Sequence, residues 1–247
     1  MGKFILQIAL ISPISLLAQE YTLVTDRPDI TESAIVLPTG ILQAEHSIQY
    51  LSTAEKQGEF SLPTLLRYGI GGRTEFRATI QSAFSHNNAE DISGILPLAL
   101  GLKISLADES RFTPQMALLA QLELPKISSP AFRDDYTGLS VMYLGSYDIP
   151  GALAIGYNMG IQFDGINLQP IYPYSVSVGI NLSEKLAVFV EHYATITKEE
   201  FNINGDGGFT WLIHPHMQVD GSAGYSWTTN QPFAGLGYSW FISTRNK

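Results

Sequence analysis

The residues most able to do chemistry in this 247-residue chain are charged side chains that recur at alternate positions. If the alternation marks β-strands, four bases and five acids point to one side: Arg67, Arg73, Arg77, Lys103, Glu45, Glu75, Glu123, Glu191 and Asp220. Unpaired charges inside a narrow, low-dielectric wall are costly, so one hypothesis is a structural network of ion pairs. The other is a ring of bases that selects anions.

Nucleophilic and metal-binding chemistry have weaker support. The chain has no cysteine, which excludes thiolate catalysis, disulfides and cysteine-type zinc sites. His46 and His192 fall on the opposite phase of the alternation, and no serine shares a convincing spacing with either of them. Ser85–Asn87 is the only local serine–histidine cluster, and His214–His216 offers just two ligands on a tight turn. We therefore expect no enzyme, cofactor or metal, and keep a lipid-hydrolysing barrel as the third alternative.

Period-two alternation, the pattern typical of strands, begins near residue 41. In residues 113–124, for example, Met116, Leu118 and Ala120 share one face while Gln121 and Glu123 take the other. About twelve such segments follow one another: 41–51, 59–70, 73–85, 94–106, 112–125, 136–147, 152–163, 169–182, 185–197, 207–214, 216–227 and 231–242. About ten residues is the length with which a tilted strand crosses a bilayer.

The connections between these segments alternate in length. Tight turns such as Gly71-Gly72 and Pro150-Gly151 follow the even-numbered segments, and longer polar connections such as 126–135 and 198–206 follow most odd-numbered ones. This asymmetry is the rule for outer-membrane barrels. We predict an all-β fold, an antiparallel transmembrane β-barrel of about 12 strands with both termini periplasmic. A soluble β-sandwich or lipocalin-like barrel is the alternative, but aromatic residues gather near the segment ends, as in interfacial girdles.

The start of the chain predicts export. Lys3 precedes the apolar run 4–11, and Ala18 provides a small residue before Gln19. This is the pattern of a secretory signal peptide, for which we assign residues 1–18. The apolar run is too short for a permanent membrane helix, and no later stretch is long and apolar enough for one. No cysteine follows that could carry a lipid anchor. The mature protein is therefore expected in the bacterial outer membrane.

The composition limits the kinds of partner that the protein can bind. The net charge of −9 argues against a nucleic acid, which requires a basic surface. Aromatic residues make up 11% of the chain, too much apolar area for a disordered protein. We expect contacts with outer-membrane lipid, a small-molecule solute and the barrel-assembly machinery. The acidic outer loops could also bind lipopolysaccharide phosphates through divalent cations, although a simple solvated rim explains them. The loop acids are Glu55, Glu59, Glu90, Asp91, Asp134, Asp135, Asp164, Glu199, Glu200 and Asp206.

Residues 19–40 form a periplasmic N-terminal segment ahead of the barrel, which we assign to residues 41–247. The segment holds Asp26, Arg27, Asp29 and Glu32, and its prolines oppose regular structure. We expect it to enter the periplasmic mouth of the barrel as a lumen plug, with its carboxylates meeting Arg67, Arg73 and Arg77. A flexible periplasmic tether is the alternative.

Two stretches in this region carry a family resemblance. They are residues 25–34 (Thr-Asp-Arg-Pro-Asp-Ile-Thr-Glu-Ser-Ala) and residues 37–45 (Leu-Pro-Thr-Gly-Ile-Leu-Gln-Ala-Glu). They resemble the opening signature of a bacterial outer-membrane family labelled as meta-pathway phenol-degradation proteins and often called transporters. The resemblance implies a barrel that acts as a channel or uptake protein for small, apolar or aromatic molecules, and it assigns no catalytic residues. One departure from barrels in general is that Phe241 is not the last residue. A closed structural or surface-binding barrel with a filled lumen is the second alternative.

Overall fold

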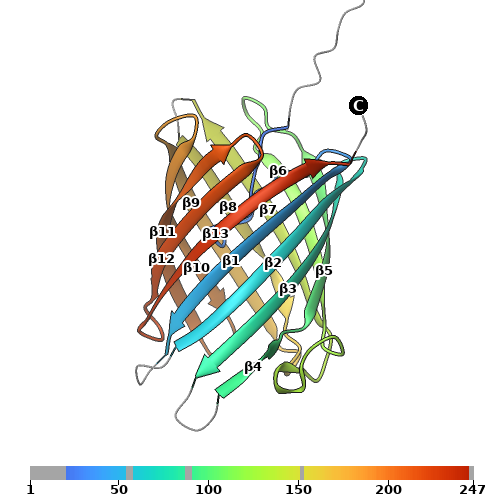
Figure 1. Ribbon diagram of the computed structural model, residues 1–247, viewed down its shortest axis with the longest axis vertical. Helices are drawn as coiled ribbons and strands as arrows, with labels where there is room; N and C mark the ends of the chain where they lie inside the picture. Colours follow the sequence, from blue (N-terminus) through green and yellow to red (C-terminus); the bar gives the residue numbers. More distant parts are fainter. Residues whose placement is uncertain (1–20, 54–57, 87–90, 151–152, 245–247) are drawn as a thin grey trace, which may run out of the picture.

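The structure is a computed structural model that describes residues 21–53, 58–86, 91–150 and 153–244, so the predicted signal peptide lies outside the described residues. The described chain is almost entirely strand (Figure 1). Its elements are β1 (Ile41–Ser52), β2 (Gly58–Gly71), β3 (Thr74–His86), β4 (Asp91–Ile95), β5 (Leu98–Ala107), β6 (Gln115–Leu124), the short 3-10 helix η1 (Pro130–Phe132), β7 (Gly138–Ile149), β8 (Leu153–Phe163), β9 (Pro170–Asn181), β10 (Leu186–Ile196), β11 (Phe201–His214), β12 (Met217–Ser226) and β13 (Gln231–Ser243). No described helix is long and apolar enough to cross a membrane.

The strands close into one antiparallel barrel. Each strand pairs with its sequence neighbours, and β1 pairs with β13 from Ile41↔Ser243 to Leu51↔Phe233. β4 and β5 lie end to end against β3, so together they occupy one position in a wall of twelve. The break falls at Pro97, which has no N–H to donate to a neighbouring strand. The predicted antiparallel barrel is confirmed, with the predicted segment 94–106 split in two.

The wall has apolar side chains outside and polar side chains inside, the reverse of a soluble protein. Large apolar side chains face outward, with exposed fractions of 67% for Leu236 and 64% for Val190. Polar and charged side chains face inward, and those of Gln43 and Lys103 are fully buried. Because a closed barrel has no free edge and pairs its own backbone groups, such a surface is stable in lipid.

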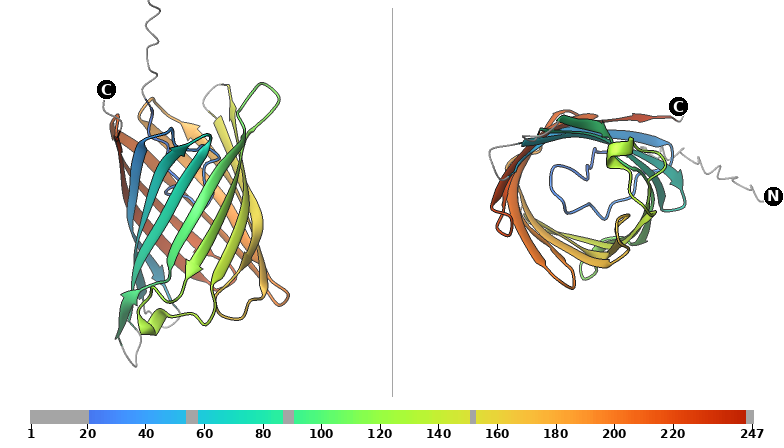
Figure 2. Two further views of the ribbon diagram at one scale, coloured as in Figure 1. Left: turned by 90° about the vertical axis from the view of Figure 1, so that its right-hand side faces the viewer. Right: turned by 90° about the horizontal axis from the view of Figure 1, so that it is seen from below.

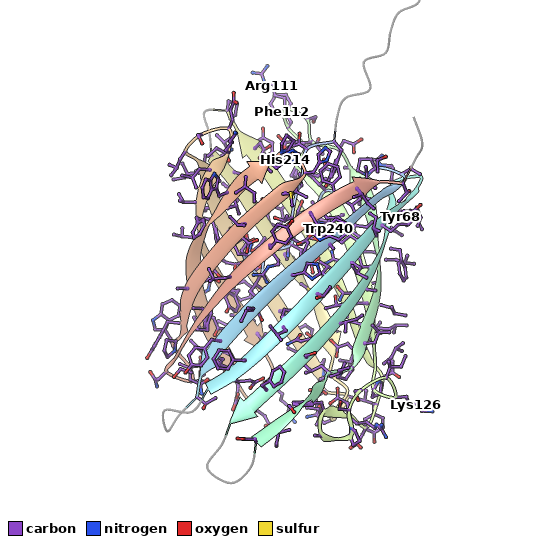
Figure 3. All side chains as sticks on the ribbon, viewed as in Figure 1. Tyr68, Arg111, Phe112, Lys126, His214 and Trp240 are labelled. Atoms are coloured by element: carbon purple, nitrogen blue, oxygen red, sulfur yellow. The ribbon has the colours of Figure 1, made fainter. Side chains whose placement is uncertain are left out.

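Aromatic rings lie toward both ends of the outer surface. Figure 3 shows Tyr68 and Trp240 on the outside of the barrel, toward the end at which Arg111 and Phe112 project. The Phe112 ring is 86% exposed and lies 5.2 Å from the Arg111 guanidinium. At the opposite end, the rings of Tyr50 and Phe60 are 4.9 Å apart. This arrangement matches the aromatic girdles of membrane barrels.

The two rims differ in their connections. One rim, here called the tight-turn rim, carries the start of β1, the end of β13 and the turn after β2, since Ile41 pairs with Ser243 and Leu42 with Tyr68. The other, here called the long-loop rim, carries the connection that contains η1. One connection at the tight-turn rim is longer than predicted, because β5 ends at Ala107 and β6 begins only at Gln115.

The predicted long connection 198–206 is wrong. β11 already begins at Phe201, because Phe201, Ile203 and Phe209 continue the outward alternation through the glycine-rich stretch. Asp206 therefore lies inside the barrel wall opposite Glu191, rather than in an outer loop.

Residues 21–40 lie within the ring of strands, as the end-on view in Figure 2 shows. They enter at the tight-turn rim and return to it, because Gly40 leads into β1 and the Tyr21 ring packs 4.8 Å from Phe241. We call residues 21–40 the plug segment. Two small apolar clusters hold the plug segment. Leu23, Leu37, Ile41 and Phe241 form the one at its ends, and Ala34, Ala117, Leu119 and Leu144 form the other.

Inward-facing glycines make room for the plug segment. A Cβ at Gly69 would lie 2.1 Å from the carbonyl oxygen of Pro38, which is backbone and cannot rotate away. We expect Gly69→Ala to lower the free energy of unfolding by about 1–3 kcal/mol through overpacking. Urea unfolding in lipid vesicles, followed by heat-modifiable gel mobility, measures the change.

Gly179→Ala is the matched control, because a Cβ there would meet its nearest atom at an ordinary 3.9 Å. Equal unfolding midpoints for the two variants would contradict the tight contact between β2 and the plug segment.

Candidate functional site: the plugged lumen

Arg67 of β2 is the central cation of the lumen, and its side chain is fully buried. Its Nε and Nη2 donate to the two carboxylate oxygens of Glu75, at 2.7 and 3.0 Å. Its Nη1 donates to Glu45 at 2.9 Å. The guanidinium also reaches both limbs of the plug segment, the one that enters the barrel and the one that returns to the rim. It donates to the carbonyl oxygens of Val24 at 3.1 Å and Ile35 at 3.3 Å. One side chain therefore ties three strands to both limbs.

Asp26 of the plug segment completes this network. Its Oδ2 lies 2.9 Å from Lys103 Nζ, 2.8 Å from Arg77 Nη1 and 3.2 Å from Arg67 Nη1. Its backbone N–H donates to Glu45 at 3.0 Å. Arg77 also pairs with Glu32 at 2.6 Å, so two acids of the plug segment meet bases of the wall.

The wall alone is not electrically balanced in this region. The bases Arg67, Arg77 and Lys103 face only two wall carboxylates, Glu45 and Glu75, so Asp26 supplies the third negative charge. Burial raises the pKa of Asp26, but the charges of Arg67, Lys103 and Arg77 outweigh it and lower that pKa below its usual range. Asp26 is therefore ionised, and its removal would leave a buried cation unpaired.

A second attachment holds the tip of the plug segment against β10. Glu191 accepts hydrogen bonds from the backbone N–H of Ile30 at 2.8 Å, and from both the backbone N–H and the hydroxyl of Thr31. The Thr31 hydroxyl also contacts Ser175 at 2.8 Å. Asp29 lies beside Glu191, and loss of hydration together with the Glu191 charge raises its pKa well above the usual value.

A third attachment involves the cation of the plug segment. Arg27 donates to Ser47 at 2.7 Å and pairs with Asp220 at 3.3 Å. Gly237 leaves space for it, since a Cβ there would lie 2.7 Å from Arg27 Nε. Each predicted charged residue of the segment thus has a place in the lumen, with Asp26 and Glu32 toward wall bases and Arg27 toward a wall acid.

One base assigned to the lumen cluster from the sequence does not join it, and Glu123 faces inward away from that cluster, as expected. Arg73 lies in the turn between β2 and β3 with a φ of 69°, so its side chain turns out and pairs with Asp108 at 2.6 Å. The Arg73 side chain is 49% exposed, and it does not meet the plug segment as expected. Glu123 lies at the long-loop end of β6, where it approaches Gly138 rather than the central network.

Polar residues that the sequence did not single out complete the attachments. Gln43 donates to the carbonyl of Val24 at 2.9 Å and to Glu45 at 2.8 Å. Gln218 donates to Thr25 at 2.9 Å. Their inward phase is visible in the alternation, but an uncharged amide gives no sign of which backbone carbonyl or hydroxyl it will meet.

The plug segment has a cavity on each side. On the long-loop side, a cavity of about 520 Å³ is lined by Pro28 and Ile30 from the segment and by inward residues of the wall. On the tight-turn side, a second cavity of about 400 Å³ is lined by residues that include Pro28, Thr31 and Phe189. We call the first cavity the cup. Pro28 lines both cavities, so the plug segment is the partition that they share.

The two outward histidines have local partners. His46 Nδ1 lies 3.0 Å from the Thr64 hydroxyl, and His192 Nε2 lies 3.1 Å from the Tyr174 hydroxyl. Neither of these contacts involves a serine, the nucleophile that a lipid-hydrolysing site of this kind would use. Among the described residues, no group of three or more acids or histidines is arranged to hold a metal ion.

Residues 25–241 match the model of the family described as "Putative MetA-pathway of phenol degradation". The chain belongs to this family. The resemblance expected from residues 25–45 is therefore confirmed, and the match extends over nearly all of the barrel. The chain matches none of the curated proteins.

Solved structures of the same architecture are outer-membrane proteins. An outer membrane channel from Pseudomonas putida F1 has a TM-score of 0.65 at 13% identity, covering 87% of this chain and 99% of that chain. The NanC porin has a TM-score of 0.60 at 8% identity, covering 80% and 98%. The KdgM porin in complex with disordered oligogalacturonate has a TM-score of 0.58 at 8% identity, with the same coverage. At these identities the likeness shows the fold.

The fold and its surface place this family member in the outer membrane. The wall is closed, apolar side chains cover its outside, and its polar groups face the lumen. A bilayer is the solvent that such a surface requires. The location predicted from the sequence agrees with this arrangement.

The charge balance around Asp26 generates a prediction. We expect Asp26→Asn to weaken docking of the plug segment by about 3–5 kcal/mol, because it leaves the buried Lys103 without an ion-pair partner among the described residues. The chain has no cysteine, so Ala34→Cys, which is buried against β6 and β7, provides a single reporter thiol. Maleimide labelling of that thiol should be much faster in the Asp26→Asn background.

Arg73→Gln is the matched control, since it removes an exposed charge outside the network. Equal labelling rates for Asp26→Asn and the control would show that Asp26 does not hold the plug segment.

Proposed function

We propose that the protein is an outer-membrane channel for the uptake of small molecules, closed at rest by the plug segment. The observation that supports this most strongly is the pair of cavities that approach the segment from opposite rims and share Pro28 as lining. Movement of about twenty residues would join them, whereas the strands of the wall would keep their pairing. The tight-turn rim would face the periplasm, as short turns do in barrels of this class.

The solutes of this channel would be small, with apolar or aromatic compounds as the class that the family's description suggests. The cup is large enough for one such molecule, since ligand cavities are typically about 300–1,000 Å³. The barrel itself is intermediate in size between filled eight-stranded barrels and open porins of sixteen strands, so the contents of the lumen decide whether solute passes.

A closed structural barrel is the second candidate, and the ion pairs of the Arg67 network favour it. All three of its buried bases are paired, and charged networks of this kind can serve to fix a structure. The two candidates differ in one respect. A channel requires that the plug segment can leave without loss of the barrel, and a structural barrel requires that it cannot.

Single-channel recording in a planar bilayer separates these candidates. We expect the full mature protein to conduct rarely and the variant lacking residues 21–36 to conduct steadily, because the cup and the tight-turn cavity would then be continuous. The deletion retains Leu37 and Ile41, which pack against Phe241. Arg73→Gln serves again as the control and should behave as the full protein does.

Silence from a deletion variant that still shows heat-modifiable mobility would refute the channel and favour the closed barrel. Turnover of labelled phospholipid by either protein would instead support the enzyme alternative, for which the described contacts of His46 and His192 give no serine partner.

A further inference from the structure

The cup has a chemistry that the attachments of the plug segment do not use. It opens at the long-loop rim, where Glu200 and Thr229 contribute to its lining, and Pro28 and Ile30 form its floor. Ile30 is 53% exposed and lines this space. The Arg67 network lies on the other side of the floor, so the cup is available to a solute while the plug segment remains docked.

The charge of the cup has one sign. Its lining includes three carboxylates, Glu59, Glu200 and Asp206, and no lysine, arginine or histidine among the described residues. The nearest base on the plug segment, Arg27, is paired with Asp220 and lines the tight-turn cavity instead. The potential inside a narrow acidic cavity attracts cations and repels anions.

Asp206 is the innermost of these carboxylates, and its side chain also interacts with that of Glu191. It faces Glu191 directly across the β10–β11 pairing, so two acids lie side by side. Its Oδ1 is shielded from solvent and has no hydrogen-bond partner among the described residues. Because Asp206 lines the cup beside a second acid, a positively charged donor in the cup would relieve the repulsion between the two carboxylates.

The remaining wall of the cup provides apolar and uncharged contacts. The rings of Tyr193 and Phe233 lie 6.4 Å apart on this lining, at an interplanar angle of 60°. Aromatic faces bind ammonium groups through cation–π attraction and bind apolar rings through stacking. Amide side chains such as Asn202 and Asn204 add carbonyl oxygens that accept from an N–H donor.

We propose that the cup is a binding site for small organic cations, specifically an ammonium group attached to an apolar or aromatic body. The ammonium would meet Asp206, and the apolar body would lie against Phe233, Tyr193 and the exposed Ile30. The inference takes from the proposed function only the idea that a bound cation would later be taken up. Binding in the cup does not depend on that function, because it requires no movement of the plug segment.

Three ring compounds of similar size and different charge test the proposal: benzylammonium, benzyl alcohol and benzoate. Binding to the full mature protein is measured by saturation-transfer NMR titration in uncharged maltoside micelles at pH 7, with protein-free micelles as the blank. We expect benzylammonium to bind about tenfold or more tightly than benzyl alcohol, as a desolvated ammonium–carboxylate contact implies, and benzoate to bind weakest.

Asp206→Asn should remove most of the preference for benzylammonium over benzyl alcohol, and Glu59→Gln should reduce it by less. Glu59 lies on β2 at the rim, so this second variant keeps the test valid if Asp206→Asn fails to fold. Glu199→Gln is the matched control, since Glu199 is exposed on the same turn as Glu200 but does not line the cup. It should leave the preference unchanged.

Equal binding of benzylammonium and benzyl alcohol would overturn the proposal and indicate a site for uncharged aromatic compounds. Tighter binding of benzoate would overturn it as well. A preference that survives both Asp206→Asn and Glu59→Gln would place the cation elsewhere and refute the cup. Conductance keeps this result separate from the proposed function, because a silent deletion variant together with benzylammonium binding by the full protein would refute the channel alone.

Discussion

The arrangement of the lumen depends on the pairing of one buried guanidinium. Arg67 is surrounded by acceptors from β1, β3 and both limbs of the plug segment, and none of its charge reaches solvent. A lysine could not replace it, because a point charge on a flexible stem cannot make two parallel bonds to Glu75 while it also reaches Glu45. The position of the plug segment follows from this geometry, since Asp26 has to lie where the remaining positive charge is.

The lumen as a whole is divided by charge. The bases of the network project from β2, β3 and β5, whereas Glu191, Asp206 and Asp220 project from β10, β11 and β12 on the far side of the ring. The plug segment is largely complementary to both sides: Asp26 and Glu32 turn toward the bases, and Arg27 with the backbone donors of Ile30 and Thr31 turns toward the acids. Asp29 is the exception, since it lies beside Glu191. A chain segment of one charge sign could satisfy only half of this wall, which explains why Arg27 stands among acids in the sequence.

Much of this could be predicted from the sequence, for a physical reason. Strand alternation is local, so the strand positions and the inward phase of Arg67, Arg77 and Lys103 follow from neighbours along the chain. The docking of an acidic segment follows from opposite charge, once those bases are known to face inward. The failures occur where geometry depends on backbone twist or on residues distant in sequence. Arg73 has the right spacing but falls on a turn with positive φ, and Gly205-Asp206-Gly207-Gly208 has the composition of a turn but continues β11. No local pattern shows that Glu191 would hold Thr31, because the contact joins residues 160 positions apart.

The apolar cluster of Leu23, Leu37, Ile41 and Phe241 lies where β1 meets β13, at the seam that closes the barrel. Two of its members belong to the plug segment and one each to the first and last strands. The cluster can therefore form only when the end of the chain has arrived beside its beginning, and a half-finished wall leaves Leu23 and Leu37 without their partner ring. Closure of the wall therefore completes the site on which both ends of the plug segment pack, and a barrel that joined its strands in the wrong register would also deny those ends their partner ring.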